Sequence, residues 1–117
     1  MKLILLTVFL TNATITSYRS VPEQTDDSPF YTATGEHVHP HGVAVSRDLL
    51  KRWGGPLDYG DWIYIEGFGV KVVNDCMAER HKKRVDIWVS TYGEEKAVGV
   101  KAGKIWVIKP ILEETRK

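Results

Sequence analysis

Apolar and polar residues alternate along most of the chain, which predicts a protein built mainly of short β-strands. Side chains of a strand point to opposite faces in turn, so a strand with one buried face shows a period of two. The pattern predicts strands over residues 13–18, 30–34, 43–45, 61–66, 70–74, 84–90 and 104–109. About seven short strands at this regular spacing are typical of a small closed barrel.

Helices are expected to be few and short. Ser46 precedes residues 47–53, where its hydroxyl can accept a hydrogen bond from a free amide of the first helical turn. The Gly-Gly-Pro run at 54–56 would end that helix. Residues 94–100 predict a second short helix.

Loops separate these elements. Two prolines make residues 19–29 a loop, and Gly67-Phe68-Gly69 predicts a turn or bulge between two strands. With 117 residues, the chain is long enough for one compact domain and too short for two.

The first 13 residues resemble a short secretory signal. One positive charge at Lys2 precedes an apolar run, and small residues follow at Thr11 and Ala13. The run is too short to span a bilayer as a helix. A first β-strand is the alternative, since residues 7–9 suit one. The export interpretation divides the chain into a signal (1–13), a barrel (14–110) and a polar tail (111–117). It places the protein in the periplasm, the cell envelope or outside the cell, with no integral membrane segment in the mature form.

Composition narrows the class of partner. Hydrophobic residues make up 43% and charged residues 26% of the chain, as in ordinary soluble domains. The net charge of +1 gives no electrostatic reason to expect nucleic acid or a membrane surface as a partner. The basic run at 80–84 is expected to be a solvated loop between two strands. We expect a monomer.

The lone cysteine and the histidines suggest no strong site. Cys76 cannot form an intramolecular disulfide, and no constellation of His with Asn or Asp marks it as a nucleophile. His37, His39 and His41 alternate and would share one face of a strand, where three imidazoles can bind zinc. Pro40 interrupts that run, so an exposed loop is the favoured interpretation, and we expect neither metal nor cofactor.

The chain contains four tryptophans, each in or beside an apolar run. We expect most of them in the core, with one or two on the wall of a groove where they can stack on a sugar ring. They are Trp53, Trp62, Trp88 and Trp106.

The strongest chemical signal is a pair of aspartates, Asp75 and Asp86, in apolar strand-like runs. A buried carboxylate is costly unless it is paired or hydrogen-bonded. On neighbouring strands the two charges would raise one pKa and supply the acid that glycosidic bond cleavage needs. Alternatively, both bond backbone amides or pair with Lys71, Lys83 or Arg84.

Several segments together resemble the 3D (Asp-Asp-Asp) domain family over about residues 13–110. They are Tyr18 with Gln24-Thr25-Asp26 and Pro29; residues 32–35; residues 42–49; residues 60–65; and Val73-Asn74-Asp75 with residues 84–88. The family is related to membrane-bound lytic transglycosylase A and rare lipoprotein A. The resemblance implies a six-stranded double-psi β-barrel that acts on peptidoglycan glycan strands.

The resemblance also implies a mechanism and its residues. The C6 hydroxyl of N-acetylmuramic acid attacks its own anomeric carbon, which breaks the bond to N-acetylglucosamine and leaves a 1,6-anhydro end. One aspartate protonates the leaving oxygen and then accepts the proton of that hydroxyl. By position, Asp86 matches the acid/base and Asp75 the aspartate that orients it. Substrate contacts are expected from Thr32, Thr34, Ser46 and Tyr18.

Two departures from the family pattern stand out. Many members have aspartate where this chain has Ser46, and many carry a glycine-rich stretch where residues 75–80 read Asp-Cys-Met-Ala-Glu-Arg. Two other functions stay open: a glycan-binding module without catalysis, in which both aspartates are structural, and a glycoside hydrolase that uses two carboxylates and water.

Overall fold

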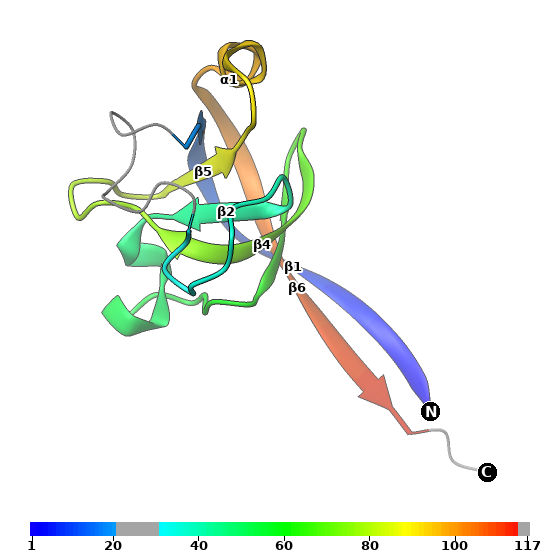
Figure 1. Cartoon of the computed structure of the whole chain (residues 1–117). Helices are drawn as coiled ribbons and strands as arrows, with labels where there is room; N and C mark the ends of the chain where they lie inside the picture. The colour runs from blue at the N-terminus through cyan, green and yellow to red at the C-terminus, as the bar shows by residue number, and fades with distance from the viewer. Residues whose placement is uncertain (21–30, 115–117) are drawn as a thin grey trace.

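Six strands close into a barrel in this computed structural model, which describes residues 1–20 and 31–114 (Figure 1). The order around the barrel is β1-β5-β2-β4-β3-β6. The strands are β1 (Lys2–Tyr18), β2 (Gly42–Val45), β3 (Trp62–Ile65), β4 (Gly69–Cys76), β5 (Arg84–Trp88) and β6 (Lys101–Glu113).

The sheet is mixed. β1 pairs with β5, and β2 with β4, in parallel, while the other four pairings are antiparallel. The predicted mainly-β barrel is therefore confirmed, with six strands in place of about seven. Residues 31–34 do not form the expected strand; Tyr31 makes one isolated bridge to His37, and residue 30 lies outside the described residues.

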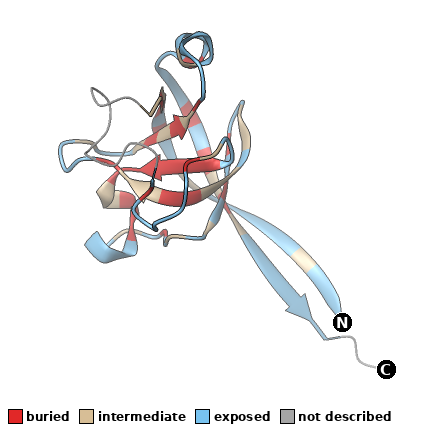
Figure 2. Cartoon of the chain, in the orientation of Figure 1, coloured by how far each residue is buried: buried red, intermediate tan, exposed pale blue. Residues whose placement is uncertain are grey.

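Alternation along the strands builds the core. Inward positions carry β-branched side chains, which suit a pleated and closely packed surface. Figure 2 shows this burial concentrated on the barrel strands. The largest fully buried side chains include Ile15, Val43, Val45, Ile63, Ile65, Val73, Val85 and Ile105.

Two helix predictions need correction. Residues 47–53 form two 3₁₀ turns, η1 (Arg47–Leu49) and η2 (Lys51–Trp53), because Leu50 between them is extended and bridges to Leu57. Ser46 makes no side-chain cap hydrogen bond; its hydroxyl accepts the Arg84 amide of β5 at 3.0 Å.

The second helix begins earlier than predicted. α1 (Tyr92–Val98) starts after Thr91, whose hydroxyl accepts the Glu94 amide at 3.1 Å. A threonine N-cap explains the start. Gly99 ends the helix with a positive φ of 59°.

The prediction that most tryptophans lie in the core was wrong. Trp53 and Trp62 are exposed, and Trp88 and Trp106 are half-buried. In the strands, the tryptophans take outward positions next to inward isoleucines: Trp62 precedes buried Ile63, and Trp88 follows buried Ile87.

β1 and β6 continue beyond the barrel as a two-stranded ribbon. β1 is one strand from Lys2 to Tyr18, so residues 2–13 have the conformation that the alternative interpretation expected. Leu10 and Ala13 of this segment contact the core. Export stays a prediction. The expected polar tail begins inside β6, with exposed Ile111–Glu113. Among the described residues, no helix is long and apolar enough to cross a membrane.

A β-bulge in β4 ties the loop at residues 31–41 to the sheet. Val43 pairs with Val73 but Ala44 pairs with Asp75, which leaves Asn74 as the extra residue. The buried Asn74 amide lies over Gly42 and donates to Glu36 Oε1 at 2.8 Å. This bond, followed by His39, holds the pKa of Glu36 below its ordinary value.

Replacing Gly42 by alanine tests this contact. An alanine Cβ would lie 2.4 Å from Asn74 Nδ2 and 3.0 Å from its Cγ, so the buried amide must move away from Glu36. We expect Gly42→Ala to lower the free energy of unfolding by about 1–3 kcal/mol in denaturant titrations. Gly93→Ala in α1 is the control, since a Cβ there meets nothing closer than 3.9 Å. Equal stability of the two variants would contradict a tight contact at Gly42.

Candidate active site

The sequence-predicted aspartates belong to one row of side chains across the outer face of the barrel. In register, Thr16 of β1 lies beside Asp86 of β5, Asp86 beside Ala44 of β2, and Ala44 beside Asp75 of β4. Their immediate chain neighbours, such as Ile15 and Val85, point into the core. The row therefore faces outward.

The two aspartates do not lie on neighbouring strands, the arrangement in which their charges would raise one pKa. β4 and β5 are consecutive in the chain, but β2 lies between them in the barrel. Two strand spacings separate the backbones of Asp75 and Asp86 by about 10 Å. Ala44, buried and small, lies between the two side chains.

Asp86 is held by a chain of hydrogen bonds. The buried Thr16 hydroxyl donates to Asp86 Oδ1 at 2.8 Å. Arg84 Nε in turn donates to Thr16 Oγ1 at 3.2 Å. Because the Thr16 oxygen accepts from the guanidinium, its proton is directed toward the carboxylate.

Burial raises the pKa of Asp86 from its ordinary value of 3.8 to about 6. The Thr16 hydrogen bond and the Arg84 charge favour the ionised form, but desolvation outweighs them. The charges of Glu95 and then Asp75 add to the upward shift. Like-charge repulsion was the predicted cause of a raised pKa, and it is the lesser one because the two aspartates stand far apart.

Asp75 has a different environment. Its Oδ1 accepts the backbone amides of Ala33 at 3.0 Å and of Cys76 at 2.9 Å. Bonding to backbone amides was the alternative left open for both aspartates, and it describes Asp75. This carboxylate therefore fastens the loop at 31–41 to the edge of the row.

Two aromatic residues lie two positions further along β1 and β5 than Thr16 and Asp86. Tyr18 pairs with Trp88, and the buried Tyr18 packs with Ala44 and Met77. Half-buried Trp88 packs against this cluster. The Trp88 indole donates to Ser20 Oγ at 2.8 Å, which fixes the ring beside the row.

The two predicted threonines are brought to the same place. Thr32 is buried and Thr34 exposed, with their hydroxyl oxygens 2.8 Å apart. Ala33 between them donates to Asp75, so both threonines stand at the Asp75 end of the row.

Ser46 does not lie where a substrate contact is expected. It is completely buried, and it exchanges two hydrogen bonds with Arg84: its amide donates to the Arg84 carbonyl, and its hydroxyl accepts the Arg84 amide. Its hydroxyl has no surface to offer a ligand. Ser46 instead extends the pairing of β2 with β5 behind Asp86.

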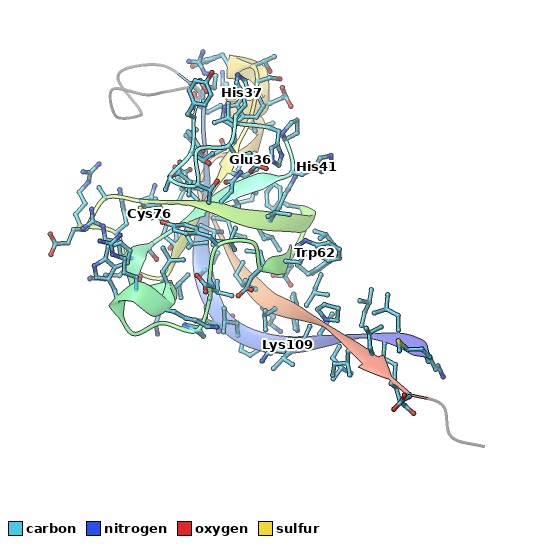
Figure 3. The ribbon with its side chains drawn as sticks, turned by 60° about the horizontal axis from the view of Figure 1, so that its bottom comes forward. Glu36, His37, His41, Trp62, Cys76 and Lys109 are labelled. Carbon is cyan, nitrogen blue, oxygen red and sulfur yellow. The ribbon has the colours of Figure 1, made fainter. Side chains whose placement is uncertain are left out.

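The three alternating histidines lie on the loop that carries Glu36, and Figure 3 labels His37 and His41 among them. His39 Nε2 is 3.1 Å from Glu36 Oε1, and the rings of His39 and His41 are 6.2 Å apart. Within the described parts of the chain, no three His, Cys, Asp or Glu side chains are grouped to hold a metal ion.

Cys76 is a free, half-buried thiol at the end of β4. Tyr59 lies beside it: burial, then a hydrogen bond with the thiol, raises the pKa of the Tyr59 phenol. A neutral phenol does not stabilise a thiolate as a cation does, so this partner does not mark Cys76 as a nucleophile.

Thr16 is the residue of the site that sequence reasoning missed, while Arg84 was considered only as an ion-pair partner and Trp88 only as one of four tryptophans. Thr16 and Trp88 take outward positions in predicted strands, so alternation carries part of the signal. Their closeness to Asp86 depends on β1 pairing in parallel with β5, which lies more than sixty positions later in the chain. Such a pairing cannot be inferred from periodicity.

The chain matches no protein-family model, and a search of curated proteins finds no match either. Its function is therefore inferred from the geometry of the site.

A pH-dependent stability difference tests the environment of Asp86. Its folded-state pKa lies above the unfolded value, so between about pH 4 and 6 the folded protein keeps a proton that the unfolded chain loses. The contribution of Asp86 to the free energy of unfolding therefore falls as the pH rises from about 4 to 6. Asp86→Asn should therefore raise the free energy of unfolding near pH 7 by on the order of 1–3 kcal/mol, with little gain below pH 4.

Chemical denaturation at both pH values measures this difference. Asp75→Asn is the matched control and should bring no gain, because that carboxylate is satisfied by two backbone amides. An Asp86→Asn variant less stable than the parent at pH 7 would contradict a desolvated carboxylate.

Proposed function

We propose that the protein is a peptidoglycan lytic transglycosylase in which Asp86 is the acid/base. The observation that carries the proposal is a half-buried carboxyl with a pKa of about 6, oriented by Thr16, on the outer face of a closed barrel. A carboxyl with such a pKa retains a protonated fraction near neutral pH and can also accept a proton.

The proposed reaction needs one such group. Asp86 donates its proton to the glycosidic oxygen as the bond to the anomeric carbon of N-acetylmuramic acid breaks. The C6 hydroxyl of the same sugar then bonds to that carbon, and Asp86 takes the hydroxyl proton. The carboxyl is regenerated, no water is consumed, and the product is a 1,6-anhydro end.

The position and hydrogen bonds of Asp75 favour this reaction over hydrolysis by two carboxylates. A retaining hydrolase holds its carboxyl groups roughly 5–5.5 Å apart, and an inverting one roughly 6.5–9.5 Å apart so that one can activate a water. Here the backbones are about 10 Å apart across β2, which argues against the retaining arrangement. Asp75 Oδ1 is occupied by the amides of Ala33 and Cys76, which argues against a free base in the inverting arrangement. An intramolecular nucleophile makes a second active carboxylate unnecessary.

The surroundings of Asp86 supply the other roles. Half-buried Trp88 presents an aromatic surface for a sugar ring, and exposed Thr34 presents a hydroxyl at the other end of the row. Asp75 positions the threonine loop through Ala33. Thr16 and Arg84 act through Asp86 as positioning residues.

The fold and cellular location belong to the same proposal. A six-stranded mixed barrel with two parallel pairs, β1–β5 and β2–β4, is compatible with the double-psi arrangement that the family resemblance implies. Peptidoglycan lies in the cell envelope, so the proposal requires the protein to reach it with β1 intact, because Leu10 and Ala13 contact the core.

A glycan-binding module without catalysis is the second candidate. It is favoured by exposed aromatic side chains remote from Asp86, on the outer face of β3 and β6: Trp62, Tyr64 and half-buried Trp106. Tyr64, Trp106 and Thr7 line a hollow of about 270 Å³. This surface does not require either aspartate.

Incubation with purified sacculi, followed by mass spectrometry of the released fragments, distinguishes the candidates. We expect the parent protein to release 1,6-anhydromuramyl products and Asp86→Asn to release none, while Asp75→Asn keeps a reduced activity. Fragments heavier by one water would identify a hydrolase. Binding to sacculi without release would favour the module, and full activity of folded Asp86→Asn would refute the proposed acid/base.

The pH profile of lysis tests the role of Thr16. The reaction begins with protonated Asp86, so the rate should fall as pH rises through about 6. Thr16→Val removes a hydrogen bond to the ionised form, which should move this midpoint to higher pH while lowering the maximal rate. Thr14→Val, two residues away and exposed, is the matched control. An unmoved midpoint in Thr16→Val would remove Thr16 from the mechanism.

A further inference from the structure

The ribbon formed by residues 2–6 of β1 and 109–113 of β6 extends away from the barrel (Figures 1 and 3). Its pairing is regular, from Lys2 opposite Glu113 to Leu6 opposite Lys109. The ribbon accounts for the elongated shape of the molecule, 58 × 27 × 26 Å. A two-stranded ribbon alone in water is marginally stable at best.

The ribbon is apolar on both faces. Cross-strand partners share a face, so Leu3 with Leu112 lies on one face, and Ile4 with Ile111 on the other. Leu3 and Leu112 are 60% and 66% exposed. Leu5 and Leu6, on opposite faces, are 54% and 45% exposed. Contiguous exposed apolar surface of this kind marks an interaction site.

The two edges of the ribbon differ. The free edge of β6 carries Lys109 and Pro110, two residue types with which proteins protect a sheet edge from pairing. The edge of β1 has no such protection: residues 3–13 contain neither a charge nor a proline. Among the described residues, β5 pairs with β1 from Thr14 onward, and no strand lies along this edge before it.

We propose that the β1 edge pairs antiparallel with the β1 edge of a second copy of this chain. The unpaired amides and carbonyls of the exposed edge form a template for another strand, and they would be unsatisfied in the hydrocarbon of a membrane. A twofold axis at Leu6 places Leu3 opposite Phe9 and Ile4 opposite Val8 of the other copy. Both copies thus use the same apolar edge of β1, as in an isologous interface.

The pairing would extend the sheet by backbone hydrogen bonds along residues 3–9, and it would bring the apolar side chains of the two β1 strands side by side on each face. The result is a four-stranded sheet, β6-β1-β1-β6, with charged and proline-bearing edges outside. This proposal replaces the expected monomer, and it does not depend on the proposed enzymatic activity.

The variant Leu6→Glu tests the contact between the two copies while keeping the β1–β6 pairing within each chain. Within one chain the introduced carboxylate faces Lys109, so the β1–β6 pairing is retained. In the dimer, the two introduced carboxylates meet at the twofold axis and repel each other. Val100→Glu is the matched control, since Val100 is 74% exposed and lies outside the ribbon.

Sedimentation velocity on the full chain, with intact mass confirming that the N-terminal strand is present, measures the outcome. We expect dimers of the parent protein and of Val100→Glu, and a monomer of Leu6→Glu. A monomeric parent protein at all concentrations would overturn the proposal, as would unchanged dimerisation of Leu6→Glu. Flotation with phosphatidylcholine–phosphatidylglycerol vesicles provides a further check: a monomer that binds vesicles through this ribbon would overturn it too.

Oxidative crosslinking tests the position of the twofold axis without introducing the charge of Leu6→Glu. In a Cys76→Ser background, Leu6→Cys should form an intermolecular disulfide, because opposed residues of an antiparallel pair have Cα atoms about 4.5–5.5 Å apart. Val100→Cys in the same background should form none. Equal crosslinking of the two would refute the proposed pairing.

Discussion

Desolvation of the Asp86 carboxyl is the interaction on which the proposed function depends. The outer wall of the barrel holds this group against Thr16 and keeps much of it from water, and this raises its pKa to about 6. The wall is made by pairing β5 with β1 on one side and β2 on the other. The residues around Asp86 are therefore set by strand register, and the core side chains that fix the register also fix the acid.

β4 supplies the other border of the site through a series of polar contacts. Lys71 Nζ donates to the Pro40 carbonyl at 2.8 Å, Asn74 to Glu36, and Asp75 accepts from Ala33. Each contact joins β4 to the loop at residues 31–41. The bulge at Asn74 makes this possible, because it brings Asp75 into the row opposite Ala44 and turns the Asn74 amide over Gly42. A loop without regular structure is thus held at three points.

The sequence predicts the closed β-barrel well because alternation is a local property, and strands such as β3 and β5 show it clearly. It also singles out both aspartates, since carboxylates in apolar runs are conspicuous. Their separation was not predictable, because β2 enters the sheet between two strands that follow each other in the chain. Ser46 shows a second limit: a serine before a helical pattern predicts a cap, but here the backbone of β5 provides a tertiary partner. The tryptophans were misplaced because hydrophobicity alone does not distinguish inward from outward positions of a strand.

Direct titration of the Asp86 carboxyl is the most direct test of its role as the acid. Carbon-detected NMR of the parent protein, with the Asp86 resonance assigned by its absence in Asp86→Asn, follows ionisation of this group without relying on activity. We expect a pKa of about 6, well above the ordinary 3.8. A pKa at or below the ordinary value would show that the carboxyl is fully ionised at neutral pH. In that case Thr16 and Arg84 would be stabilising a structural anion, and Asp86 would not be the acid.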